Sequence, residues 1–324
     1  MSAQRVKRQG QQGLTLIELM VALVIGLVIT IAASMVYVTT TNSTRVTQSV
    51  SDLGETGQLA LEILGREVKK AGFFPAQFSA KDQSLQPGSF ENTKLPGNAV
   101  FNQGVFGCEG ANYNPATQAC EARVAGAPDG IVINYTATAD FGDAAVIGNH
   151  RDCNRDAVSG DAANGAALAT GRPLYVSNRF GLIATTYTAA NGSTVNTRSL
   201  ACHGNGSEAA TTLAPQLSGF DDLVIRYGVY GATANQQTPD RYYTATEVSA
   251  LPLAGDLSPW QRVTSVHVCL VVRTPDAVRQ AEGATARTFR DCRDNDITLS
   301  NADRTLLRRF ERVFAVRNNL KAAL

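Results

Sequence analysis

One carboxylate lies inside a strongly apolar stretch near the start of the chain. The stretch reads GLTLIELMVALVIG, from Gly13 to Gly26, and the carboxylate belongs to Glu18. A charged side chain within a membrane helix costs about 2.5–3.5 kcal/mol or more, and such residues are usually functional. The chemistry that this position indicates is charge pairing with a group on another chain. The alternative is a plain membrane anchor in which a glutamate falls near the interface by chance.

The order of residues before Glu18 predicts proteolytic processing. Residues 1–13 are polar and basic, and they end at the small residue Gly13. An ordinary secretory signal has its small residues after the apolar segment, whereas here the small residue comes first. Cleavage between Gly13 and Leu14 removes the basic leader and keeps the apolar helix. It also creates an α-amino group four residues before Glu18.

Six cysteines, all beyond the apolar stretch, predict disulfides formed in an oxidising compartment. No CxxC pair occurs, which argues against zinc-ribbon or thioredoxin chemistry. Isolated buried thiols are the alternative. Six cysteines allow 15 pairings, and the sequence alone does not select one. From the local sequence around each cysteine we expect Cys108–Cys120, Cys153–Cys202 and Cys269–Cys292.

The histidines give weak support for a metal or catalytic site. His150 and His203 lie near Cys153 and Cys202 in the sequence, so they could meet if these cysteines pair. His267 alternates with valines in a β-rich segment, which is typical of a structural residue. The chain has no GxSxG, HExxH or P-loop motif. We therefore predict that the protein is not an enzyme and has no metal site and no cofactor.

A segment of alternating polar residues resembles the start of a calcium loop. Asp152, Asn154 and Asp156 occupy alternate positions. The segment lacks the glycine and the twelfth-position glutamate that such a loop needs. We interpret it as a solvated loop.

Composition and charge narrow the possible function classes. The chain has 324 residues and a net charge of +1, with 44% hydrophobic and 18% charged residues. A balanced charge does not favour a nucleic-acid surface, which needs clustered basic residues. The composition is that of an ordered protein.

One long helix is expected to begin in the apolar stretch. The 25 residues from Leu14 to Val38 are apolar apart from Glu18 and a few hydroxyls, which is enough to span a bilayer. The basic flank before them predicts a cytoplasmic N-terminus and an exported remainder. An apolar stripe at spacings of three and four then continues to Ala71, where KKAGFFP ends the helix. The stripe consists of Val46, Val50, Leu53, Gly57, Leu61, Leu64, Val68 and Ala71.

The remainder of the chain is predicted to be rich in β-strands. Residues 76–128 are rich in Gly, Asn, Pro, Ser and Gln and are expected to form long loops. One long helix followed by several strands predicts an α+β fold, with the helix packed on an antiparallel sheet. The strands expected from β-branched and aromatic runs are 130–138, 173–178, 181–189, 221–231, 263–274 and 310–318.

The N-terminal sequence KRQGQQGLTLIELMVALVIG resembles the class III signal of type IV prepilins and pseudopilins. The residues Gly13 to Glu18 match its pattern of glycine, an apolar residue, Thr, Leu, Ile and Glu, with Leu14 in place of the commoner Phe. The resemblance implies that a prepilin peptidase cuts after Gly13 and that Leu14 becomes N-methylated. It also implies that Glu18 compensates the charged N-terminus of a neighbouring subunit in the filament core.

Four further segments resemble PilW-type minor pilins and their GspJ-type relatives in secretion systems. These segments are LEILGREVKKAGFF, LSGFDDLVIRYGV, WQRVTSVHVCLVVRT and RRFERVFAVRN. The resemblance implies a type IV pilin fold and a minor pilin that takes part in pilus assembly within a priming or tip complex. A pseudopilin of a type II secretion system is one alternative. A membrane-anchored periplasmic enzyme, or a tip adhesin or DNA-uptake subunit, is another.

The domain layout and the partners follow from these two resemblances. The expected segments are a cleaved leader (1–13), a membrane or filament-core half-helix (14–38), an amphipathic half-helix (39–75) and an exported head (76–324). The expected partners are other minor pilins, the major pilin, the prepilin peptidase and the inner membrane. The head is expected in the periplasm before assembly and at the cell surface after it.

Overall fold

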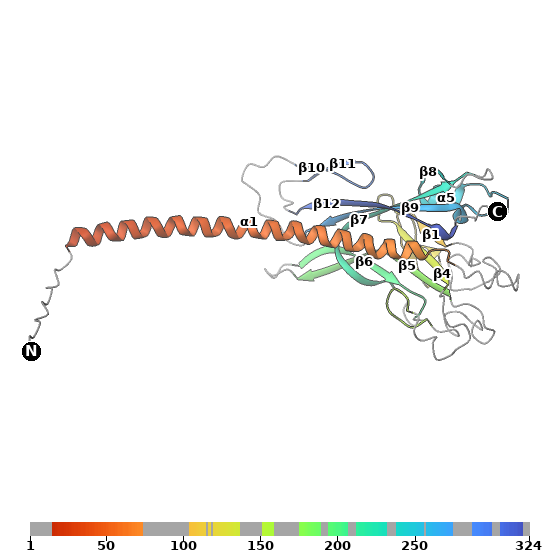
Figure 1. The fold of residues 1–324 in the computed structure, drawn as a ribbon, viewed down its shortest axis with the longest axis horizontal. Helices are drawn as coiled ribbons and strands as arrows, with labels where there is room; N and C mark the ends of the chain where they lie inside the picture. Colours follow the sequence, from red (N-terminus) through yellow and green to blue (C-terminus); the bar gives the residue numbers. More distant parts are fainter. Residues whose placement is uncertain are drawn as a thin grey trace, which may run out of the picture. The chain divides into compact units, whose positions relative to one another are not determined.

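A computed structural model describes most of the 324-residue chain as one long helix followed by antiparallel strands (Figure 1). The α+β fold expected from the sequence is confirmed. The described residues are 15–73, 104–114, 116–117, 119–136, 151–158, 175–188, 194–206, 212–231, 238–255, 257–274, 287–299 and 305–319.

Helix α1 runs from Leu16 to Lys70 without interruption. Its C-terminal end has the features that the sequence indicated. Lys69 and Lys70 lie in the last turn, and Gly72 adopts a left-handed conformation with φ of +72°. The side-chain amide of Asn318 donates to the carbonyl of Ala71 over 2.9 Å, so a residue near the C-terminus caps the helix.

The chain divides into two compact units, and the boundary falls between Ser49 and Val50 inside α1. In the first unit no described side chain is buried. By length and composition, α1 is a helix that could cross a membrane. The continuous apolar surface from Leu16 to Val38 supplies this property.

In the second unit, α1 packs on the sheet through one stripe of small and branched residues. This stripe agrees with the predicted one from Leu53 onward but not before it. Val46 is half-buried and Val50 is 42% exposed, so the prediction was wrong for Val50. The buried part of the stripe begins at Leu53. The buried positions are Leu53, Gly57, Ala60, Leu61, Leu64, Gly65 and Val68.

The main sheet has the strand order β1-β4-β5-β6-β7-β9-β12, and β8 pairs with β7. All of its pairings are antiparallel. The long β7 pairs with β6 through its first half and with β9 through its second half. The strands are β1 (Val105–Cys108), β4 (Gly130–Thr136), β5 (Tyr175–Thr188), β6 (Thr194–His203), β7 (Ala214–Tyr230), β8 (Pro239–Tyr243), β9 (Val263–Arg273) and β12 (Leu307–Ala315).

Two short hairpins and three short helices complete the described part of the chain. One hairpin joins β2 (Tyr113–Asn114) to β3 (Ala119–Cys120), and the other joins β10 (Arg287–Arg290) to β11 (Asp296–Leu299). The short helices are α5 (Ala245–Ala250), η4 (Pro259–Arg262) and η5 (Arg317–Asn319).

Each predicted strand overlaps a strand of the structure, but some bounds differ and several strands were not predicted, among them β1 to β3 in the segment expected to form loops. The segments 173–178 and 181–189 belong to the single strand β5. Strand β7 starts seven residues before the predicted 221, at Ala214. Strand β6 was missed because TVNTR, its first half, is polar and exposed. Its place between β5 and β7 comes from pairing with distant segments, which outweighs local propensity.

Candidate assembly site

The start of α1 holds the carboxylate that the sequence singled out. Gly13 and Leu14, the predicted processing residues, lie outside the described residues. Thr15 stands just before the first helical residue, and Glu18 lies in the first turn. The Oε2 atom of Glu18 accepts the backbone N–H and the hydroxyl of Thr15, both at 2.9 Å. The Thr15 hydroxyl in turn accepts the backbone N–H of Glu18 over 3.3 Å.

These three hydrogen bonds form a capping box, in which each residue satisfies an N–H of the other. The carboxylate also lies at the positive end of the helix dipole, where an anion is favoured. Sequence reasoning missed this role, although the pattern Thr-x-x-Glu at the head of an apolar run is its usual signal. In the described residues only Oε2 is engaged, so Oε1 can accept from a donor on another chain.

The surface of α1 beyond Glu18 is apolar around its whole circumference. Glu18 is the last charged residue before Arg45. Several hydroxyls in this stretch bond back to the carbonyl four residues earlier, as Thr30 does to Gly26 over 2.7 Å and Ser34 to Thr30 over 2.7 Å. Polar groups on the helix are thereby satisfied internally, as a lipid or filament core requires. The most exposed large side chains are Leu16, Ile17, Met35, Val36 and Tyr37.

Two glycines in the second half of α1 pack against two phenylalanine rings of β12. A Cβ at Gly57 would overlap the ring of Phe310, and a Cβ at Gly65 would overlap the ring of Phe314. The two glycines are eight residues apart, which is about 12 Å along a helix, and the two rings are four residues apart, about 13 Å along a strand. Close packing of a ring against the helix therefore explains Gly57 and Gly65. Gly26 has nothing within 4 Å of its Cβ position.

The structure joins the cysteines in the three pairs expected from the sequence. The Cα–Cα distances are 5.5 Å for Cys108–Cys120, 6.3 Å for Cys153–Cys202 and 5.7 Å for Cys269–Cys292. The first disulfide fastens the β2–β3 hairpin to the end of β1. The third fastens the turn between β10 and β11 to the middle of β9.

The segment around the second disulfide is more ordered than predicted. Asp152 is buried, so the interpretation of this segment as a solvated loop was wrong for that residue. Its Oδ1 accepts the backbone N–H of Asn154 over 2.9 Å and of Asp156 over 3.0 Å, and its Oδ2 accepts that of Gly206 over 2.8 Å. The carboxylate therefore folds its own loop and ties it to the segment after β6, because unpaired backbone N–H groups cannot be buried cheaply.

Two of the three histidines, His203 and His267, lie among the described residues. His150 lies outside the described residues. His203 is buried, and its Nδ1 lies 3.2 Å from a guanidinium nitrogen of Arg179. His267 lies on β9 and its Nε2 is 3.5 Å from Glu311, so it is a surface-facing strand residue. Within the described ranges, no group of three or more His, Cys, Asp or Glu side chains could hold a metal ion.

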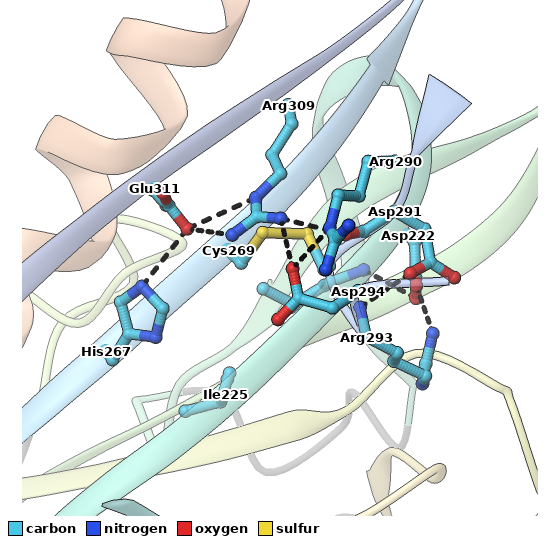
Figure 2. Close-up of a disulfide and its surroundings, with 12 residues drawn as sticks. Asp222, Ile225, His267, Cys269, Arg290, Asp291, Arg293, Asp294, Arg309 and Glu311 are labelled. Atoms are coloured by element: carbon cyan, nitrogen blue, oxygen red, sulfur yellow. Dashed lines mark hydrogen bonds and ion pairs between the residues drawn. A yellow bond between two sulfur atoms is a disulfide. The ribbon is translucent and has the colours of Figure 1, made fainter. Parts of the chain in front are cut away.

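Charged residues surround the third disulfide on the face of the sheet away from α1 (Figure 2). Arg293, next to Cys292, pairs with Asp222 of β7 and donates to the carbonyl of Ala127 over 2.7 Å. Burial raises the pKa of Asp222, and the adjacent Arg293 opposes that rise. These contacts hold the β10–β11 turn against the sheet.

A second set of contacts joins the same turn to β12. Arg309 of β12 donates to Asp294 over 2.9 Å and to Glu311 over 2.6 Å (Figure 2). Hydrogen bonds from Arg309 and Arg290 hold the pKa of Asp294 below its usual value. The segment RDCRDND, expected to be a charged turn, is thus a turn whose charges are paired across strands. These pairs hold the turn between β10 and β11 against β12.

Comparison with known proteins gives one match at the start of the helix and one in the β-rich part of the chain. Residues 186–318 match the family described as type IV pilus-assembly protein W, and residues 8–34 match the prokaryotic N-terminal methylation motif. No curated protein matches the chain at a significant level. Among solved structures, the chain is similar to a type IV-like pilin from Thermus thermophilus, with 13% identity and a TM-score of 0.37. The likeness covers 82% of this chain and 97% of that one.

Proposed function

We propose that this chain is a minor pilin of a type IV pilus and that it serves in a priming or tip complex. The N-terminal methylation motif at residues 8–34 and the PilW match at residues 186–318 support the pilin assignment. As a pilin it is processed by prepilin peptidase, is anchored in a membrane by α1 and associates with other pilus components. The proposal has three further parts. The chain lies in a priming or tip complex, the peptidase cuts between Gly13 and Leu14, and the head is in the periplasm before assembly.

The observation that carries the proposal is the state of Glu18. Its Oε2 is occupied by the capping box, while no described residue engages Oε1. Beyond it the helix surface is apolar and exposed over the whole segment from Leu16 to Val38. A buried carboxylate needs a partner charge, and the α-amino group of a neighbouring, processed subunit has the opposite charge. The chain therefore acts as a structural subunit whose helix is completed by other helices.

The processing step is tested by mass analysis of the mature N-terminus. We expect a chain that begins at methylated Leu14. A chain that begins at Met1, or at any residue beyond Val38, contradicts the proposal, since either one lacks the proposed pairing at Glu18.

The assembly role of Glu18 is tested by Glu18→Ala in cells that express all the other pilus components. We expect normal insertion and cleavage, with at least a tenfold lower share of the protein in sheared pili, because one buried ion pair left incomplete costs about 3–5 kcal/mol. Thr15→Val removes the capping hydroxyl but keeps the carboxylate, and it separates capping from pairing. Glu55→Ala, an exposed glutamate on the same helix, is the control.

The position in the pilus is tested by labelling the head with gold-conjugated antibody. We expect label at one end of each filament. Label at regular intervals along the filament shaft argues against a priming or tip complex. It leaves the pilin assignment itself intact.

A further inference from the structure

The two edges of the main sheet differ in how they are protected. At the β1 edge, Val105 and Cys108 are buried, and Phe106 packs on Trp260 of η4 with ring centroids 5.1 Å apart. At the β12 edge, the described strand pairs only with β9. Arg308, Arg312 and Val313 are exposed there, Val313 by 51%. An exposed edge of this kind is a template for another strand.

Hydrogen bonds at both ends of β12 identify which backbone groups point outward. Val316 donates to the carbonyl of Thr264 over 2.8 Å, and Thr274 donates to the carbonyl of Leu306 over 2.9 Å. Residues with even numbers therefore face β9, because the direction alternates along an antiparallel strand. The residues whose N–H and C=O groups face away from β9 are Leu307, Arg309, Glu311, Val313 and Ala315.

Two arginines along the same edge have no carboxylate partner among the described residues. Arg309 is paired with Asp294 and Glu311. By contrast, no carboxylate of the described chain lies within ion-pair distance of Arg308 or Arg312. These two arginines are four residues apart, so their side chains leave the same face of the strand. A strand added at this edge places its own side chains about 5 Å from theirs.

We propose that the outer edge of β12 is a docking site for an extended segment of another exported protein, with acidic side chains four residues apart. The main-chain groups of the five odd-numbered residues supply the hydrogen bonds. Arg308 and Arg312 select the charge of the incoming strand. This mode of recognition is β-strand addition, in which the backbone gives affinity and alternate side chains give specificity.

A second copy of this chain fits the edge poorly. Two β12 strands that pair by their outward groups around a two-fold axis must be centred on a residue. Centres at Arg308, Arg309 and Arg312 bring two arginines face to face, a centre at Glu311 brings two glutamates together, and a centre at Phe310 sets Arg308 opposite Arg312. The remaining centres, such as Val313, avoid like charges but pair at most five residues of β12. Like charges directly opposite destabilise a strand pair, so the charges favour a different, acidic partner.

The test uses the full-length mature protein in detergent and the nine-residue peptide TVEVTVEVT as a probe, followed by fluorescence anisotropy. We expect binding that is lost when alternate amides of the peptide are N-methylated, and that is at least about tenfold weaker for TVKVTVKVT, since each lost contact of this kind changes affinity by about that factor. Equal binding of the N-methylated peptide shows simple charge attraction and overturns the proposal.

Variants of β12 test whether the peptide binds at the outer edge of this strand. Val313→Pro removes one outward N–H and leaves the pairing with β9 complete, so we expect it to weaken binding of TVEVTVEVT about tenfold. Val313→Thr keeps the N–H and is the matched control. In case the proline perturbs the strand, Arg312→Glu gives a second test, with preference shifting to TVKVTVKVT.

Two other results overturn the proposal. Slow hydrogen exchange at Glu311 and Val313 in the free monomer means that the rest of the chain already covers the edge. Concentration-dependent dimers that Val313→Pro abolishes mean that the occupant is a second copy.

Discussion

The two halves of helix α1 have the same backbone geometry and opposite relations to their surroundings. Between Leu16 and Ser49 no side chain is buried, and from Leu16 to Val38 apolar residues cover every face. Between Val50 and Lys70 a single stripe is buried against the sheet, and glycines in that stripe receive aromatic rings. The first half therefore needs a membrane or other helices to cover it, whereas the second half is completed by its own chain.

The difference shows why the same residue type has different roles in one helix. Gly65 lies under the ring of Phe314, while Gly26 has open space beside it. Glycine in a helix interior costs about 1 kcal/mol relative to alanine. Of these two glycines, Gly65 has a contact within the described chain that offsets this cost, whereas Gly26 does not. Substitutions in the two halves should therefore affect separate properties of the protein.

The largest expected effect comes from removing the disulfide of the longest loop. In the chain-entropy relation, replacing Cys153 and Cys202 with alanine destabilises the head by about 4 kcal/mol, because these cysteines are 49 residues apart. The helical signal of the first half of α1 should persist after the head unfolds. Circular dichroism of the full chain in detergent, recorded during thermal unfolding, measures both.

The control for that variant is removal of the disulfide that closes the shortest loop. Replacing Cys108 and Cys120, which are 12 residues apart, should cost less, about 3 kcal/mol. Loss of the whole helical signal together with the head would mean that the two halves of α1 unfold as one unit.

Gly65→Leu should destabilise the head by about 3 kcal/mol, because the new side chain competes with Phe314 for the same space. Gly26→Leu introduces the same side chain where nothing lies within 4 Å, so the melting temperature of the head should not change. Adding Phe314→Ala to Gly65→Leu should recover part of the loss. Equal effects of the two leucine variants would remove the basis of the comparison.

Thr15→Val should loosen only the first turn of α1, by about 1 kcal/mol, since a capping side chain is lost. Hydrogen exchange of the amides from Leu16 to Leu19 should rise, with no change in head stability. Thr30→Val removes a hydroxyl that bonds back to Gly26 within the helix and is the matched control. If both variants exchange at the same rate, the capping box does not hold the helix start.

The smallest effect concerns pH and belongs to the head. Burial raises the pKa of the Asp129 carboxyl, against the backbone N–H groups of Gly110 and Ile225 that donate to it over 2.8 Å. Because the pKa of Asp129 is higher in the folded than in the unfolded state, the protonated carboxyl stabilises the folded head. This stabilisation is complete below the unfolded-state pKa and is lost as the pH rises through the folded-state pKa.

Comparing the wild-type protein with Asp129→Asn therefore isolates this group. The difference in unfolding free energy in favour of the wild-type protein should be larger at pH 3 than at pH 7, measured by denaturant titration. A difference that grows toward pH 7 would show that the carboxylate form is the one the head prefers.

Much of this protein could be predicted from residues that are near one another in the sequence. The leader, Gly13, Leu14 and Glu18 form one continuous pattern, and the extent of α1 was predicted to within two residues at its start and one at its end. The tendency of a segment to enter a membrane and the periodicity of a helix both depend on residues within a few positions of one another. Both can therefore be predicted from the sequence. The short spacing of Cys108 and Cys120 belongs to the same class.

Other features were decided only by the tertiary structure. Strand β6 exists because β5 and β7 flank it, and Asp152 is buried because the distant Gly206 donates to it. Gly57 and Gly65 face rings about 250 residues further along the chain. The open edge of β12 is visible only once the strand order is known. Each of these depends on contacts between residues far apart in the chain, and the energy of such contacts is set by the partner as much as by the residue itself.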